Sequence, residues 1–450
     1  MKHLHLSSGI SRRSLLGGAA ASAASAAVAA VGSRRPASAA GQARPANVRV
    51  SHDGYGTHVE PCLASSPADP RNLLAACMVG ASATPELIAS YASFDGGMTW
   101  HSSGPLPLPA GTVTADDVTV AFDSAGRGFV CAMATSGTSR DDRGVYIWRT
   151  DDGGRSFAAP VTVMAGQFAD HPWMAADRSR GSRTGNVYAV WVAADHGALG
   201  FSRSADGGIS FEPPRMIQGQ ADVNVSTPMA AAGPHGLVCA IYESTPVPAA
   251  SPDAGFQVEV VSSADGGQTF GAPVTLGQDA SVLVLPGGVA PDNGPAIAAA
   301  PSGRAVYAAF TTHQPGTGHS AIVVSASYDR GRTWQPPVTA TPPGPVIYFQ
   351  PQLAVQDSGQ VALSAFALAD GRVDVVLLTS QPGTPRFGRP LRVTSKPFDP
   401  ARGTLSGGKH GAWWIGDYQG LAACPGALHP LWNDTRTGQL ELFTATVYRE

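Results

Sequence analysis

The chain has 450 residues, of which 43% are hydrophobic and 14% are charged, a balance that excludes an intrinsically disordered protein. Its 53 glycines and 37 prolines favour many short elements joined by tight turns over long helices. The formal net charge of −3 comes without a basic stripe, so we expect no nucleic acid among its partners.

The N-terminal segment 1–39 has the pattern of an export signal rather than of folded structure. Arg12 and Arg13 precede a weakly apolar, alanine-rich run, and "ASA" at 37–39 forms a small-x-small cleavage pattern. The segment resembles a twin-arginine signal, which carries folded proteins across the bacterial inner membrane, and a Sec signal is the alternative. We therefore expect a periplasmic or extracellular protein with one domain, 40–450. No later stretch predicts a membrane span.

A short apolar strand recurs seven times along this domain, and each copy is entered by polar residues. The copies centre on Leu63, Val120, Met174, Ala230, Ile297, Leu353 and Leu421, with spacings of 54 to 68 residues. In the regular units two further apolar strands and a proline-led fourth strand follow. Four short strands per unit, repeated without a helical pattern, predict a β-propeller.

A second repeat lies between the third and fourth strands of five units. Its first copy is "SFDGGMTW" at 93–100, and the five copies place aspartates at Asp95, Asp152, Asp206, Asp265 and Asp329. In a hairpin turn, aspartate accepts hydrogen bonds from its own turn amides, and glycine supplies a positive φ. We interpret the five aspartates as structural, because this role accounts for every position of the repeat.

The seventh unit ends after its third strand, so its outer strand must come from elsewhere. The segment 44–50, "RPANVRV", resembles the outer strand "RPLRVTS" at 389–395. We therefore predict an all-β, seven-bladed propeller of four-stranded antiparallel blades, in which the N-terminal strand completes the last blade. Closure of this kind removes the open edge that a linear stack of sheets would leave.

The five aspartate turns resemble the Asp boxes of the BNR-repeat propellers in the sialidase superfamily, and the resemblance covers 44–450. "DHPWMAAD" at 170–177 and "WNDTRTG" at 432–438 are similar to motifs of exported bacterial sialidase-like proteins. The resemblance implies structural Asp boxes far from the active site, with the six-bladed sialidase fold as an alternative architecture. The Phe/Tyr-Arg-Ile-Pro motif of true sialidases is absent.

Strand direction places the starts of the seven inner strands on the face opposite the Asp boxes. Binding is expected there, where the loops vary and the central channel opens. The carboxylates expected at this rim are Asp117 and Asp170, with Glu60 and Asp417 in reserve. Residues expected to contact substrate are His171, Gln350, Tyr418, Trp413, Trp414 and Arg436.

Three interpretations of this acidic rim remain open. It fits a glycosidase carboxylate pair, an oxygen-ligand site of the kind Ca²⁺ takes, or a polar, water-filled channel mouth. The first predicts a secreted glycoside hydrolase that acts on a glycan or polysaccharide and is not a true sialidase. The alternative is a non-catalytic propeller that binds a glycan or a protein.

Cofactor, metal and redox signals are sparse. We expect no cofactor and no dedicated metal motif, and we expect a monomer. Cys62 and Cys77 flank a turn and face each other if their strands form a hairpin in that register, so a disulfide between them is an open alternative.

Overall fold

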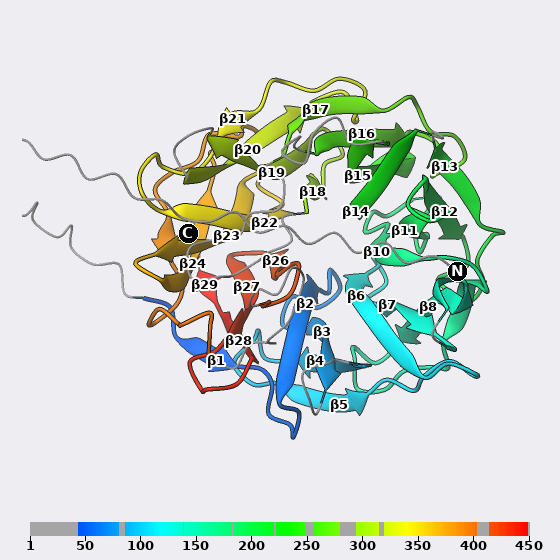
Figure 1. The fold of residues 1–450 in the computed structure, drawn as a ribbon, viewed down its shortest axis with the longest axis horizontal. Coiled ribbons are helices and arrows are strands. Elements are labelled where there is room, and N and C mark those ends of the chain that lie inside the picture. The colour runs from blue at the N-terminus through cyan, green and yellow to red at the C-terminus, as the bar shows by residue number, and fades with distance from the viewer. Residues whose placement is uncertain are drawn as a thin grey trace, which may run out of the picture. The chain divides into compact units, whose positions relative to one another are not determined.

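The computed structural model describes residues 44–80, 86–137, 139–181, 183–219, 222–247, 256–279, 294–314, 319–402 and 414–448. These residues form seven antiparallel sheets that stand around a common axis (Figure 1). The described part contains two 3-10 turns, η1 (Arg140–Asp142) and η2 (Pro234–Gly236), and no α-helix. The all-β, seven-bladed propeller predicted from the repeats is confirmed.

Six of the blades are built from four consecutive strands each, in the order inner to outer. Blade 1 contains β2 (Thr57–Ser65), β3 (Leu73–Gly80), β4 (Leu87–Ser93) and β5 (His101–Pro105), and blade 2 contains β6 (Thr114–Phe122), β7 (Gly128–Thr135), β8 (Arg143–Thr150) and β9 (Val161–Ala165). Blade 3 contains β10 (Asp170–Ala176), β11 (Val187–Ala193), β12 (Ala198–Ser204) and β13 (Arg215–Gly219), and blade 4 contains β14 (Val223–Gly233), β15 (Leu237–Pro246), β16 (Gln257–Ser263) and β17 (Val274–Gln278). Blade 5 contains β18 (Ala296–Ala299), β19 (Val306–Gln314), β20 (His319–Ser327) and β21 (Val338–Thr339), and blade 6 contains β22 (Ile347–Val355), β23 (Val361–Ala369), β24 (Arg372–Thr379) and β25 (Leu391–Arg392).

Blade 7 joins the two ends of the propeller domain. It contains β26 (Gly420–Cys424), β27 (Ala427–Asp434) and β28 (Glu441–Ala445), with β29 (Val447–Tyr448) also paired to β27. Its outer strand is β1 (Asn47–Arg49), which pairs antiparallel with β28 from Asn47 opposite Ala445 to Arg49 opposite Phe443. The prediction that the N-terminal strand completes the last blade is therefore confirmed.

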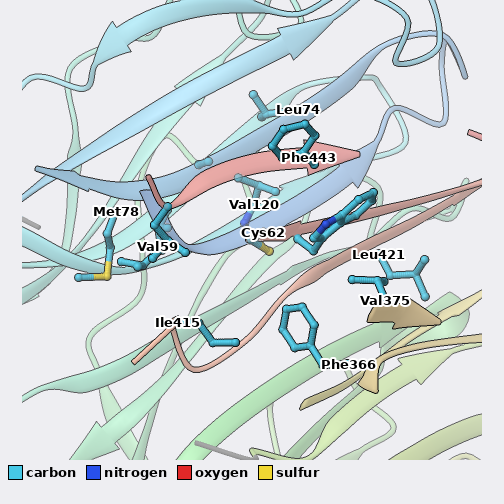
Figure 2. Packing of buried hydrophobic residues seen from close by; sticks show 14 of the residues in the cluster. Val59, Cys62, Leu74, Met78, Val120, Phe366, Val375, Ile415, Leu421 and Phe443 are labelled. Carbon is cyan, nitrogen blue, oxygen red and sulfur yellow. Dashed lines mark hydrogen bonds between the residues drawn. The ribbon is translucent and has the colours of Figure 1, made fainter. Parts of the chain in front are cut away.

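The inner strands converge on the axis, and their sequence reflects the narrow space there. One position along the inner strand is alanine in all seven blades: Ala64, Ala121, Ala175, Ala231, Ala298, Ala354 and Ala422. All seven of these alanines line the central channel, and their small side chains leave it open. Larger apolar residues instead pack between blades, as Figure 2 shows for Val120 of blade 2, Phe366 of blade 6 and Phe443 of blade 7.

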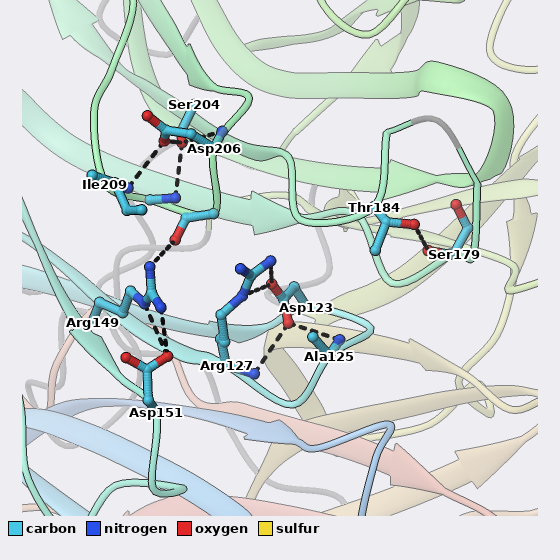
Figure 3. Close-up of polar contacts among 12 residues, drawn as sticks. Asp123, Ala125, Arg127, Arg149, Asp151, Ser179, Thr184, Ser204, Asp206 and Ile209 are labelled. Carbon is cyan, nitrogen blue, oxygen red and sulfur yellow. Dashed lines mark hydrogen bonds and ion pairs between the residues drawn. The ribbon is translucent and has the colours of Figure 1, made fainter.

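Each Asp box is a self-contained turn. In the blade 3 box, Asp206 Oδ1 accepts the amides of Ile209 and Ser210 at 3.0 Å each, and Oδ2 accepts the Ser210 hydroxyl at 2.5 Å. The Ser204 hydroxyl donates to Asp206 Oδ1 at 2.7 Å (Figure 3). Partial burial acts to raise the pKa of Asp206, but the hydrogen bonds from Ser210 and Ser204 outweigh it and lower this pKa to about 2. The carboxylate is thus occupied within its own turn.

The same turns also hold neighbouring blades together. The second box glycine lies against the preceding blade, so a Cβ on Gly208 would come within 2.6 Å of the Phe129 ring. Arg149 of blade 2 donates from Nη1 to the Gly207 carbonyl of blade 3 at 3.2 Å (Figure 3). The repeat therefore encodes contact between blades as well as the turn itself.

Register separates the two cysteines of the first hairpin. Cys62 lies opposite Ala76, so Cys77, one residue further, points to the other face of the blade. Cys62 packs between blades 1 and 2, where its sulfur accepts the Val120 amide at 3.4 Å, and Cys77 packs on the blade 7 side. All five cysteines are free thiols, and Cys62 and Cys77 do not form a disulfide.

Candidate functional site

The inner strands of five blades carry a β-bulge where they enter the channel. At each bulge one non-glycine residue has a positive φ: Glu60 at 58°, Asp117 at 51°, His171 at 45°, Thr227 at 45° and Gln350 at 49°. The pairing register with the second strand shifts at every one of these positions. We refer to these five residues as the bulge ring, and to the face that carries them as the upper face.

A positive φ is unfavourable for residues with a side chain, by about 1–2 kcal/mol each. A bulge re-aims the side chain of its extra residue, and such strain concentrates at ligand sites. In four of the five cases the next residue is proline, which lacks the amide that a regular ladder would require. The backbone at this rim is therefore shaped to present one side chain per blade, and the side chain differs in each blade.

A small pocket lies within this rim, near the axis. Its walls include Asp117, His171 and Thr227 from the bulge ring and Asp417 and Tyr418 from the entry to β26. It encloses about 10 Å³, roughly the room that one water molecule requires. The strand pattern predicted that Asp117, His171, Asp417 and Tyr418 lie together, and the structure brings these four side chains to one pocket.

An aromatic pair forms the floor of the pocket. The rings of Trp173 and Tyr418 meet edge to face with centroids 5.4 Å apart, and the Tyr418 hydroxyl donates to the Val118 carbonyl at 3.0 Å. Trp173 lines both this pocket and the channel on its other side. The pair therefore separates the upper face from the channel below.

The carboxylates of this face influence one another. Burial raises the pKa of Asp117, His171 opposes this shift, and the charges of Asp170 and Asp417 add to it. The His171 amide donates to Asp117 Oδ2 at 3.1 Å. Burial, with the charge of Asp117 in second place, also raises the pKa of Asp116 to about 7. Asp117 and Asp116 are therefore suited to hold a proton at a pH where ordinary carboxyl groups have lost it.

Asp170 lies in a different environment. Arg143 Nη1 donates to Asp170 Oδ1 at 3.2 Å and to the Ala169 carbonyl at 2.9 Å, and the guanidinium lies 5.4 Å from the centroid of the Phe168 ring. Asp170 is thus ion-paired with a side chain from the neighbouring blade. Arg143 was not predicted from the sequence. Its place at the start of a third strand was the available signal, because third strands begin on the upper face.

The remaining predicted residues take positions around this centre. Glu60 is buried, and Gln350 donates from Nε2 to the Gly416 carbonyl at 2.6 Å. The Trp414 indole donates to Asp417 Oδ1 at 2.6 Å, so this tryptophan orients a carboxylate of the pocket. Trp413 lies outside the described residues.

Arg436 lies where the ring closes, between the N-terminal strand β1 and blades 6 and 7; we call this junction the seam. Its guanidinium pairs with buried Asp434, donates from Nη1 to Asn47 Oδ1 at 3.0 Å and to Ser395 Oγ at 2.9 Å, and lies 4.4 Å from the centroid of the Phe443 ring. These contacts tie the N-terminal strand to blades 6 and 7. The placement favours a structural role over the substrate contact that its motif suggested.

Two further properties concern metals and membranes. In the part of the chain that the structure describes, no group of three or more His, Cys, Asp or Glu side chains is arranged to hold a metal ion. Within the same ranges, no helix has the length and hydropathy that crossing a bilayer requires.

Comparison with known proteins agrees with this architecture. The sequence profile of the BNR repeat-like domain matches residues 128–406, more than half of the chain. A search of curated proteins finds no match.

Solved structures that superpose on this chain have low sequence identity to it. An ulvan lyase of polysaccharide lyase family PL25 superposes with a TM-score of 0.52 at 10% identity, over 88% of this chain and 96% of that one. The GH93 α-L-arabinofuranosidase of Fusarium graminearum gives 0.48 at 13% identity, over 89% and 97%, and the leech intramolecular trans-sialidase gives 0.48 at 13%, over 72% and 67%. At 10% identity, the likeness to the ulvan lyase shows the fold alone.

Proposed function

This chain belongs to the BNR repeat-like domain family, and on that premise we propose that it is an exported glycoside hydrolase that acts on a glycan from its upper face. The observation that carries the proposal is the contrast between two neighbouring carboxylates. Burial and like charges raise the pKa of Asp117, whereas Asp170 is ion-paired with Arg143. Carboxyl groups whose environments differ in this way take the roles of acid and base.

In this mechanism Asp117 is the general acid and protonates the oxygen of the scissile glycosidic bond. Asp170, which is ion-paired with Arg143, either activates a water molecule or attacks the anomeric carbon. The His171 amide hydrogen bond fixes the orientation of Asp117. Asp417, oriented by Trp414, and Glu60 are the reserve carboxylates of the same rim.

The test is sugar release from a panel of polysaccharides and aryl-glycosides, including a sialic acid probe. Asp117→Asn and Asp170→Asn are each expected to lower the rate by at least about 100-fold, the usual contribution of an acid or base catalyst. Asp141→Asn is the matched control, because Asp141 is an exposed carboxylate in η1 of the same blade. Wild-type rates in both site variants would reject the catalytic assignment.

A second candidate is a non-catalytic binding propeller. The pocket of about 10 Å³ favours it, because a sugar ring must then lie across the rim rather than inside a cavity. A glycan array separates the two candidates. Retained binding with no product from any bound glycan would support the binder and exclude the hydrolase.

A further inference from the structure

The channel beneath the Trp173–Tyr418 pair is a second cavity, distinct from the upper pocket. It encloses about 350 Å³ and extends along the inner strands to the Asp-box side of the ring, which we call the lower face. Ligand sites for small molecules usually measure about 300–1,000 Å³. The channel thus has the volume of a site for one small molecule, whereas the upper pocket does not.

The walls of the channel offer hydrogen-bonding groups along their length. Each inner strand is the last strand of its sheet, so one of its edges faces the channel instead of another strand. Such an edge presents backbone N–H and C=O groups. The alanine position of the inner strands leaves these groups accessible, since a methyl group covers little of the backbone beside it. A ligand with several hydroxyl groups matches this lining better than an alkyl chain does.

The lower mouth of the channel carries a single positive charge. Of the described residues that line the cavity, Arg178 is the only basic one and Asp357 the only acidic one. Arg178 lies two residues after the end of β10, and its Nη2 donates to the Ser65 carbonyl at 3.3 Å. Among described residues this is its one hydrogen bond, which leaves most of the five guanidinium N–H donors for a ligand.

The surroundings of Arg178 favour a ligand with one negative charge. Crowding by the channel walls lowers the pKa of Arg178, and the charge of Asp357 opposes that shift. The Arg178 side chain is exposed at the channel mouth, and a guanidinium binds a carboxylate through two parallel hydrogen bonds. The nearby Asp357 would repel a second negative charge on the ligand.

We propose that the lower channel is a binding site for a small polyhydroxylated monocarboxylate, a sugar acid, whose carboxylate pairs with Arg178 and whose hydroxyl groups bind the edges of the inner strands. This site is independent of the carboxylates on the upper face, because the Trp173–Tyr418 pair lies between them. Its occupancy does not depend on whether the protein hydrolyses glycans.

The test is calorimetric titration of the full-length protein with glucuronate as the probe. Glucose lacks the carboxylate, hexanoate lacks the hydroxyl groups, and phosphate provides a second oxyanion. Arg178→Gln is expected to weaken glucuronate binding at least about tenfold. Arg180→Gln is the matched control, since Arg180 is an exposed arginine two residues further that does not line the cavity. Thermal unfolding of both variants verifies the fold.

Cys424 provides a second measurement that does not depend on heat signals. It lines the same mouth, and it is the one partly exposed cysteine among the five. Bound glucuronate is expected to slow its alkylation by iodoacetamide in the wild type and not in Arg178→Gln. The proposal is overturned if glucuronate does not bind, if glucose, hexanoate or phosphate binds as tightly, or if Arg178→Gln binds like the wild type.

Discussion

The two faces of the propeller use one repeated backbone in opposite ways. On the lower face, five blades place the same residue, aspartate, in the same turn, and each carboxylate is occupied by its own turn. On the upper face, five blades repeat the same strained bulge but present a different side chain at it, from Glu60 in blade 1 to Gln350 in blade 6. In a repeat protein, a constant residue at a constant position therefore indicates a structural role, and a varying residue at a constant position indicates a site.

Glycine usage sharpens the contrast. The Asp boxes meet their need for a positive φ with glycine, as at Gly207, except in blade 5, where Arg330 takes that conformation at 70°. The bulge ring meets the same need entirely with larger residues. The Asp boxes therefore mostly avoid the strain of a positive φ by using glycine. The bulge ring carries that strain, because each of its positions must present a side chain.

The largest expected effect tests whether every polar residue on the upper face belongs to the site. Arg436→Gln leaves the fully buried carboxylate of Asp434 without its partner, and loss of one member of a buried ion pair costs about 3–5 kcal/mol. We expect that loss in the free energy of unfolding by denaturant, with sugar release per folded molecule unchanged. Arg332→Gln, an exposed arginine of the blade 5 box, is the control. If Arg436→Gln were as stable as the wild type, the structural role of Arg436 at the seam would be rejected.

The next prediction concerns contact between blades on the lower face. Gly208→Ala places a Cβ 2.6 Å from the Phe129 ring at a φ of +79°, so strain and overpacking together should cost about 3 kcal/mol. Gly96→Ala is the matched control, with a φ of +78° and no atom within 4 Å, and should cost about 1 kcal/mol. Equal losses in the two variants would mean that the box glycines serve the turn alone.

A smaller effect is expected from the box carboxylate itself. Asp206→Ala removes the acceptor for the amides of Ile209 and Ser210, much like the loss of a helix cap, and should cost about 1–2 kcal/mol. Asp151→Asn, which affects an exposed ion pair with Arg149, should cost less than about 0.5 kcal/mol. If Asp206→Ala abolished sugar release from a fully folded protein, the separation of the two faces would fail.

The last prediction is a difference in pH dependence between the faces. The pKa of Asp116 is raised to about 7, so its contribution to stability is complete below about pH 4 and is lost as the pH rises through 7. Asp116→Asn should therefore stabilise the protein at pH 8, by up to about 1.4 kcal/mol for each unit by which the pKa is raised, and leave it unchanged near pH 4. The pKa of Asp206 is lowered to about 2, so its contribution is present above about pH 4 and is lost as the pH falls through 2. Denaturant unfolding measured from pH 2 to pH 8 gives the contribution of each aspartate to stability. If both contributions changed with pH in the same direction, the opposite pKa shifts of Asp116 and Asp206 would be contradicted.

Sequence was most informative where the physics is local. The Asp box needs only residues within eight positions to close its turn, so its role follows from the repeat itself. Seven apolar anchors gave the number of blades, and the likeness of 44–50 to an outer strand gave the closure. These predictions rest on patterns that a strand or turn imposes on its own sequence.

The site was less accessible to sequence, because its parts come together only across blades. Arg143 begins the third strand of blade 2, and Asp170 begins the first strand of blade 3, so no spacing rule connects them. The positive φ at Asp117 follows from a bulge and not from any glycine in the sequence. Arg436 is the opposite case. A family-like motif suggested that it binds substrate, but its side chain contacts residues that hold the ends of the ring together.

Ring closure also has consequences for the order in which the blades fold and for the order in which they unfold when the chain is pulled. Asn47 pairs with Ala445, 398 residues later in the sequence. A chain emerging from the ribosome presents β1 long before β28 exists, so blades 1 to 6 are able to form before the ring closes. The closing step must bring together two distant ends, which makes it the slow one. For the same reason, a force that pulls the two ends apart acts first on the few hydrogen bonds between β1 and β28, and the propeller should open there before any blade unravels.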